Sequence, residues 1–123
     1  MSLKTTLDIR KDYLLIRASG VFLSGDEVEQ YAHFLLGSVE TEDVNRVLLN
    51  EQQLIDKTDP LDASYIGNSE KMVKLTMRGV RIACLFNPKY ADQARAYETA
   101  LQNRSISYRN FISEDEALDW LLS

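Results

Sequence analysis

Carboxylate side chains recur in one stretch of the sequence, at Asp56, Asp59 and Asp62. Oxygen ligands suit a divalent cation, but this spacing does not match the calcium loop, which takes ligands at alternate positions and a closing Glu. An Asp before a proline, or at the start of a helix, is also an ordinary turn or capping residue. The sequence therefore predicts no metal site and no cofactor. An enzyme acting through these three carboxylates is a third hypothesis, behind the two described below.

Two hydroxyl side chains, Thr58 and Ser64, lie in the same region. A phosphate is tolerated near the N-terminus of a helix, so both residues are candidate phospho-acceptors. The simpler interpretation makes Ser64 a polar residue of the first helical turn.

Basic side chains follow at Lys71, Lys74 and Arg78, spaced i, i+3 and i+7. This spacing places them along one side of a helix, where they would meet an acidic partner or a lipid head group, or simply face solvent. Together with the acidic loop they form the candidate partner-binding set: Glu51, Asp56, Asp59, Asp62, Lys71, Lys74 and Arg78.

Aromatic residues suggest a second kind of site. Tyr31, Tyr90 and Tyr97 fall on the apolar stripes of predicted helices. They belong either to an ordinary core, with hydroxyls reaching the surface, or to an apolar pocket between helices and sheet. Phe22 and Tyr65 would complete such a pocket at the strand ends.

The remaining reactive residues are a single histidine and a single cysteine. His33 lies outside the apolar stripe of its helix, and no cysteine cluster accompanies it to bind zinc. Cys84 lies between Ala83 and Leu85, a position typical of a buried, unreactive thiol.

The whole chain has the size and composition of one small globular domain, residues 1–123. Its net charge of −5 disfavours nucleic-acid binding, which needs a basic surface. No apolar run is long enough to span a bilayer, and the first residues lack the apolar core of a signal peptide. With one cysteine and no internal disulfide, the expected location is cytoplasmic.

The elements that position these residues are predicted from apolar periodicity. Residues 46–50 contain three consecutive branched apolar residues, so this strand is covered on both faces and lies inside a sheet. The polar loop 51–62 follows it, and sites in α/β sheets collect beyond the carboxyl ends of such strands. Residues 3–9 and 13–18 predict an antiparallel hairpin, and residues 80–86 and 106–112 two further strands. Gly20 ends the second strand of this hairpin.

Helical patterns fill the other intervals. One helix begins at Ser24, which has capping-box spacing with Glu27, and ends at Gly37 or Ser38. Another covers residues 61–77, with a kink or a break at residues 67–69.

The predicted order is β-β-α-β-α-β-α-β-α, an α/β fold with a mixed, mostly parallel sheet of about five strands and about four helices. Three stretches carrying this order, residues 13–22, 46–51 and 108–121, resemble the STAS superfamily of sulphate-transporter and anti-sigma-factor-antagonist domains. The fold of that group is similar to the CRAL-TRIO lipid-binding domains. The resemblance implies a single STAS-like domain whose functional mark is a phosphorylated serine in an Asp-Ser-x-Gly segment after the third strand. Residues 56–64 do not contain that segment.

The function predicted first is therefore a non-enzymatic, STAS-type module that presents loop 51–62 and the start of the next helix to a protein partner. The alternative is a carrier of a small apolar ligand or lipid, bound between helices and sheet. Trp120, Leu121 and Leu122, near Tyr108 and Phe111, would either pair two chains as a homodimer or fold back on the last strand.

Overall fold

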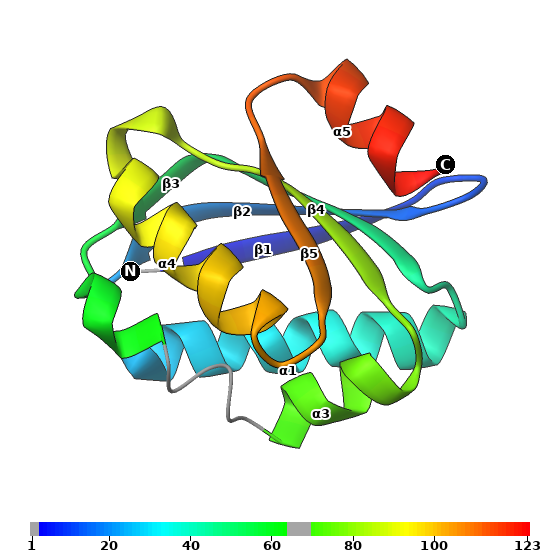
Figure 1. Cartoon of the computed structure of the whole chain (residues 1–123), viewed down its shortest axis with the longest axis horizontal. Coiled ribbons are helices and arrows are strands. Elements are labelled where there is room, and N and C mark those ends of the chain that lie inside the picture. The colour runs from blue at the N-terminus through cyan, green and yellow to red at the C-terminus, as the bar shows by residue number, and fades with distance from the viewer. Residues whose placement is uncertain (1–2, 64–69) are drawn as a thin grey trace.

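The chain folds into a five-stranded sheet with helices on both faces (Figure 1). This computed structural model describes residues 3–63 and 70–123, with the backbone alone for Asp62. The described elements, in chain order, are β1 (Leu3–Ile9), β2 (Leu14–Phe22), α1 (Gly25–Glu42), β3 (Arg46–Asp56), the 3-10 helix η1 (Pro60–Asp62), α3 (Glu70–Met77), β4 (Arg81–Leu85), the 3-10 helix η2 (Pro88–Tyr90), α4 (Ala91–Gln102), β5 (Ser107–Phe111) and α5 (Glu114–Leu121).

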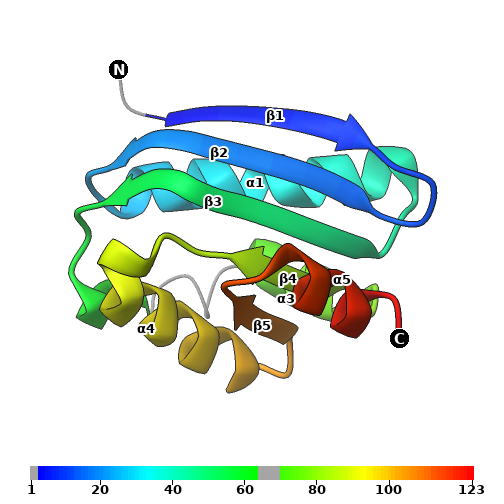
Figure 2. The same cartoon turned by 90° about the horizontal axis from the view of Figure 1, so that it is seen from above.

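The strands lie side by side in sequence order, β1-β2-β3-β4-β5 (Figure 2). β1 is antiparallel to β2, and every later pair is parallel. Crossovers between parallel strands are right-handed, and each crossover here steps in the same direction across the sheet. For that reason α1, α3 and α4 all cover one face. α5 follows the last strand and packs on the opposite face, against β3, β4 and β5.

The core is divided by the sheet into two parts. In β3, Val47 and Leu49 point toward α1, whereas Leu48 points toward α5. All three are almost fully buried, which confirms that this run lies inside a sheet covered on both faces. The predicted fold class is confirmed as well, with five strands and four α-helices in the described part of the chain.

The end of β3 differs from the prediction. Loop 51–62 is expected to begin at Glu51, but β3 continues to Asp56. The extension forms because β2 also continues, past Gly20 where we expected it to end, and the two strands pair as far as Phe22 and Asp56. Only residues 57–59 connect β3 to η1.

Helix α1 also extends beyond its predicted end at Gly37 or Ser38. The Ser38 hydroxyl donates to the Phe34 carbonyl at 2.8 Å, a bond that lets serine remain inside a helix. The helix ends where Asp43 adopts a left-handed conformation, with φ of 54°. Its start is as predicted, because Ser24 and Glu27 form a capping box.

The helix predicted over residues 61–77 is represented by η1 and α3 at its two ends. The expected kink at residues 67–69 lies outside the described residues. None of the helices in the described ranges is long and apolar enough to cross a membrane.

Candidate functional site

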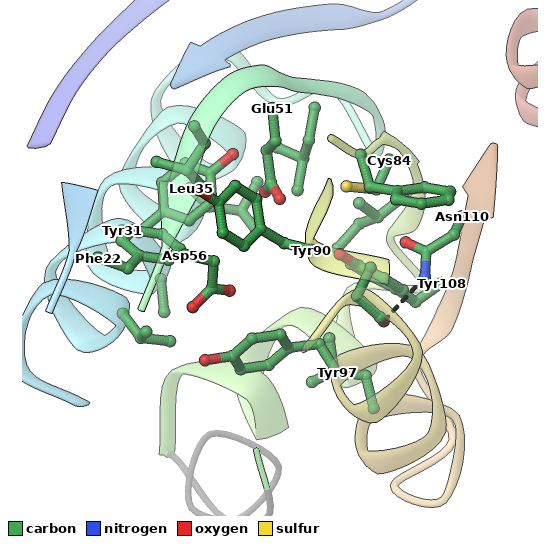
Figure 3. Close-up of a pocket in the computed structure, with 18 of the residues that line it drawn as sticks. Phe22, Tyr31, Leu35, Glu51, Asp56, Cys84, Tyr90, Tyr97, Tyr108 and Asn110 are labelled. Atoms are coloured by element: carbon green, nitrogen blue, oxygen red, sulfur yellow. Dashed lines mark hydrogen bonds between the residues drawn. The ribbon is translucent and has the colours of Figure 1, made fainter. Parts of the chain in front are cut away.

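A cavity forms where the pairing of β3 with β4 ends and the two chain segments separate. β4 ends at Leu85, opposite Asn50. Glu51 and Gln52 lie at a shift in the register of β3 with β2, and from Gln53 to Asp56 β3 pairs only with β2. The chain leaving β4 then turns away into η2 and α4. Between the second half of β3 and α4 lies a partly enclosed cavity of about 70 Å³ (Figure 3).

Side chains replace the missing strand pairing along this free edge of β3. The Asn87 amide donates to the Leu54 carbonyl at 3.1 Å, and the Gln93 amide donates to the carbonyls of Asp56 and Thr58 at 3.4 Å each. Backbone acceptors are therefore satisfied without closing the sheet. Asn87 at the start of η2 and Gln93 of α4 thus contact this edge of β3 in place of a neighbouring strand.

The walls of the cavity are mostly apolar and aromatic. α1 contributes Tyr31, Ala32 and Leu35, and α4 contributes Ala94 and Tyr97. The other lining residues are Phe22, Val28, Leu49, Glu51, Leu54, Asp56, Met72, Ile82, Cys84, Phe86, Asn87, Tyr90, Leu101, Tyr108 and Asn110.

Two carboxyl groups from β3 face this apolar interior. Glu51 follows Leu49 by two positions, and Asp56 follows Leu54 by two. A register shift between Asn50 and Gln53 changes the alternation, so both side chains face the α1 side of the sheet. In Figure 3, Glu51 points into the middle of the cavity and Asp56 points toward Tyr97. Among the described residues, no Lys or Arg forms an ion pair with either carboxyl group.

The surroundings change the acidity of both groups. Burial raises the pKa of Glu51 from 4.5 to about 7, against interactions with the Tyr31 hydroxyl and the Cys84 thiol that lower it, and the charge of Asp56 adds a smaller rise. Burial also raises the pKa of Asp56, although hydrogen bonds from Thr58 oppose the shift. Glu51 is consequently about half protonated at neutral pH, which is unusual for a carboxyl group.

Asp56 is held in place by Thr58 and Tyr97. The backbone N–H of Thr58 donates to Asp56 Oδ1 at 3.0 Å, and the Thr58 hydroxyl donates to the same oxygen. That hydroxyl also lies 3.0 Å from the hydroxyl of Tyr97 on α4. Asp56, Thr58 and Tyr97 thus form a short chain of polar contacts that joins the connection between β3 and η1 to α4.

Two buried polar atoms of the cavity lining have no hydrogen-bond partner in the described part of the chain. They are the Tyr31 hydroxyl and Asn110 Oδ1. The Asn110 amide nitrogen donates to the Ala94 carbonyl at 2.8 Å, drawn as a dashed line in Figure 3, which fixes the amide orientation and leaves Oδ1 as the free acceptor. The charge of Glu51 adds to burial in raising the pKa of the Tyr31 hydroxyl. A buried polar atom without a hydrogen bond lowers the free energy of unfolding, so such atoms are uncommon in native folds.

The floor of the cavity includes Cys84 of β4 and Tyr108 of β5. Burial, together with the nearby charge of Glu51, raises the pKa of the Cys84 thiol well above its ordinary value. The thiol therefore stays protonated, as predicted for a buried, unreactive cysteine.

Comparisons with known proteins bear on the fold. No known family profile matches the chain, and no curated protein matches it by sequence. Three solved structures resemble it along nearly its whole length. An uncharacterized protein from Shewanella loihica with a SpoIIAA-like fold is 21% identical, with a TM-score of 0.54 over 98% of this chain and 94% of that one.

The other two structures are of named regulators. The anti-sigma factor antagonist SpoIIAA in its unphosphorylated form is 19% identical, with a TM-score of 0.56 over 97% of this chain and 96% of that one. An anti-sigma factor antagonist from Mycobacterium paratuberculosis is 11% identical, with a TM-score of 0.56 over 99% of this chain and 96% of that one. The chain has a STAS-like fold. At this level the predicted resemblance is confirmed.

Within the STAS-like fold, the predicted pocket residues come together. Phe22, Tyr31, Tyr90 and Tyr97 all line the cavity. Tyr65 lies outside the described residues. Ligand binding by this set stays a prediction.

The predicted partner-binding loop is divided by the structure. The expectation that Glu51 and Asp56 lie on an exposed loop is wrong, because both belong to β3 and face the cavity. Asp59 is exposed, and its carboxylate accepts from the Leu61 N–H at 3.0 Å as the N-cap of η1. The side chain of Asp62 lies outside the described part. Asp56 and Asp59 thus have different surroundings, and no group of three potential metal ligands occurs among the described residues.

The candidate phospho-acceptor that the structure describes, Thr58, is buried rather than exposed to solvent. Thr58 is only 4% exposed, and its hydroxyl contacts Asp56 and Tyr97. Ser64 lies outside the described residues. Phosphorylation of either residue stays a prediction.

The basic residues of α3, and Arg78 directly after it, form ion pairs within the fold in part. Lys71 pairs with Glu29 at 2.7 Å and Arg78 with Asp43 at 2.8 Å, which ties α3 to α1. Lys74 is exposed.

At the C-terminus the structure matches the alternative in which the final residues fold back on the last strand. Leu121 is fully buried and Trp120 packs against Phe111, with ring centroids 5.7 Å apart. Tyr108 is buried on the cavity side of the sheet. A homodimer stays a prediction.

Sequence reasoning missed part of this site. Cys84, Tyr108 and Asn110 lie on different strands, and only their pairing register brings them near Glu51. The alternation of Glu51 with Leu49 was the one available signal, and the polar run Glu51-Gln52-Gln53 concealed it by suggesting a loop.

Proposed function

We propose that the protein is a non-enzymatic regulatory module that binds a protein partner with the segment leaving β3, residues 57–61. The observation that carries this proposal is Leu61, which is 81% exposed on η1 at the carboxyl edge of the sheet. The cap from Asp59 orders this turn, so the apolar side chain is presented without a large ordering cost. Support comes from two proteins of the same fold that are named anti-sigma factor antagonists.

The flanking residues suit a polar rim around an apolar contact. Lys57 and Asp59 are exposed on the two sides of the buried Thr58. The Lys57 N–H donates to the Phe22 carbonyl at 2.9 Å, which anchors the segment to β2. Interfaces commonly combine a central apolar side chain with such a rim.

Phosphorylation would act on this segment through Thr58. A phosphate there would break the contacts with Asp56 and Tyr97 and place negative charge beside a carboxyl group. The segment 57–61 would then leave its present position, and partner binding would change with it.

The test is affinity capture from the native host with the wild-type protein, Leu61→Asp and the matched control Met77→Asp. Met77 is also 81% exposed, but it lies on α3. We expect a protein that the wild type and the Met77 variant retain and the Leu61 variant loses. Equal capture by all three, or equal loss in both variants, would contradict the proposal.

The cavity favours a second candidate function, a carrier of a small, largely apolar ligand. Pockets of this kind combine apolar walls with a few convergent polar groups. Native mass spectrometry of protein purified from its own host, followed by denaturing mass analysis, tests it. A noncovalent adduct that is lost on denaturation supports the carrier, and a bare chain speaks against it.

A further inference from the structure

Several acceptor atoms that face the cavity are left open by the described residues, although the Tyr31 hydroxyl and the Cys84 thiol interact with Glu51. Both hydrogen bonds that reach the Asp56 carboxylate go to Oδ1, so its Oδ2 accepts none from the described residues. Asn110 Oδ1 is a buried acceptor with no partner among the same residues. Glu51 adds a third acceptor group in the middle of the cavity (Figure 3). A ligand that brings N–H or O–H donors would complement these acceptors.

The charge of the site also favours a ligand that carries N–H donors. Two carboxyl groups face an apolar space that no Lys or Arg of the described residues enters. A buried carboxylate without a counter-charge is unfavourable, and a cationic ligand would offset that cost.

Aromatic rings surround the same space and suit a cation. Phe22 and Tyr31 contact each other with ring centroids 5.5 Å apart, and Tyr90, Tyr97 and Tyr108 line the other walls. The face of an aromatic ring attracts ammonium groups, most strongly where water is excluded.

From these observations we infer that the cavity binds a small primary amine, with its ammonium group between Glu51 and Asp56 and its apolar part against the tyrosine rings. This inference rests on the carrier function proposed above and adds the chemical class of the ligand. The Tyr31 hydroxyl, which interacts with Glu51 and belongs to a residue only 7% exposed, is a further partner for the ammonium group. A cavity of about 70 Å³ has room for about five water molecules, so a ligand of similar size fits inside.

The binding should strengthen as pH rises through neutrality, because Glu51 loses its proton there while the amine stays charged. A neutral ligand of the same shape gains nothing from this ionisation. The titratable groups that face or surround Glu51 are Tyr31 of α1, Asp56 of β3, Cys84 of β4, Tyr90, Tyr97 and Glu98 of α4, and Tyr108 of β5.

The experiment compares n-butylamine, n-butanol and butyrate as probes, followed by amide NMR shifts of Ala32 and Ala94 in the wild-type protein. We expect the amine to bind more tightly than the alcohol, and butyrate to bind least. Glu51→Gln should weaken amine binding about tenfold and leave the alcohol unaffected. Glu40→Gln, which removes the same group from an exposed position outside the cavity, should change neither.

The contradicting outcomes separate the two proposals. Equal affinity for amine and alcohol would overturn the amine inference and leave the carrier function standing. No shift with any of the three probes would overturn both. The dispersion of the NMR spectrum reports whether each variant is folded. If Glu51→Gln does not fold, Asp56→Asn is the second variant, and it too should weaken amine binding and leave alcohol binding unchanged.

Discussion

The two halves of β3 show how one strand serves both scaffold and site. Residues 46–50 pair with β2 on one side and β4 on the other, and their apolar side chains are buried on both faces. Residues 51–56 have only β2 beside them and pair with it from Gln53 onward, and two of their side chains are carboxylic acids that face a cavity. Losing one neighbouring strand thus replaces apolar core positions with polar groups that border a cavity.

The largest expected effect lies in the first half. Leu48 is 1% exposed and packs against α5. Leu48→Ala should lower the free energy of unfolding by about 3 kcal/mol, because it leaves a cavity in a closely packed core. Urea unfolding measures this change. Ile55→Ala is the comparison in the second half, where the side chain is 37% exposed and a loss below about 1 kcal/mol is expected. Equal losses of unfolding free energy in the two variants would contradict the difference between the two halves of β3.

The next effect concerns Glu51 and depends on pH. The native state holds the Glu51 proton up to a pKa of about 7, whereas the unfolded chain releases it near 4.5. The native state binds more protons in this range, so this group makes the free energy of unfolding fall as pH rises from about 4.5 to about 7. Glu51→Gln removes that loss, and its advantage over the wild type should grow by about 1–3 kcal/mol across the window.

Urea unfolding of both proteins at the two ends of this pH window tests the Glu51 prediction. The exposed Glu40→Gln variant is the control and should follow the wild type at both pH values. A Glu51→Gln advantage that does not change with pH would show that Glu51 ionises normally.

A smaller effect is expected at the free edge of β3. Asn87→Ala removes the bond to the Leu54 carbonyl and the N-cap of η2. The expected loss is about 1–2 kcal/mol, because a buried acceptor and a helix start both lose their partner. Thermal unfolding measures it against Asn103→Ala, an exposed position with little expected change. If both variants unfold alike, the side chains of η2 do not hold the opening.

The sequence predicted the fold through patterns that packing enforces. Apolar runs on both faces identify the central strands, and capping residues such as Ser24 locate helix starts. The ends of β2 and β3 were missed because Glu51, Gln52 and Gln53 resemble a loop in isolation. Only pairing with β2 makes them a strand, and pairing between distant segments leaves no local signal.

The site was predicted less completely for the same reason. Helical spacing placed Tyr31, Tyr90 and Tyr97 on inward faces, and all three line the cavity. The depth at which Glu51 lies follows from where β4 ends and α4 begins, and no property of the residue itself indicates it. The acidic stretch is unusual in its composition, yet the two acids that line the cavity, Glu51 and Asp56, belong to β3.

The most direct test of this account is an NMR titration of the Glu51 carboxyl carbon in the folded protein. The division of the sheet places this group in an apolar cavity without a counter-charge, and the account predicts a pKa of about 7. A pKa close to the ordinary 4.5 would contradict the central claim, because it would mean that the second half of β3 exposes Glu51 to water.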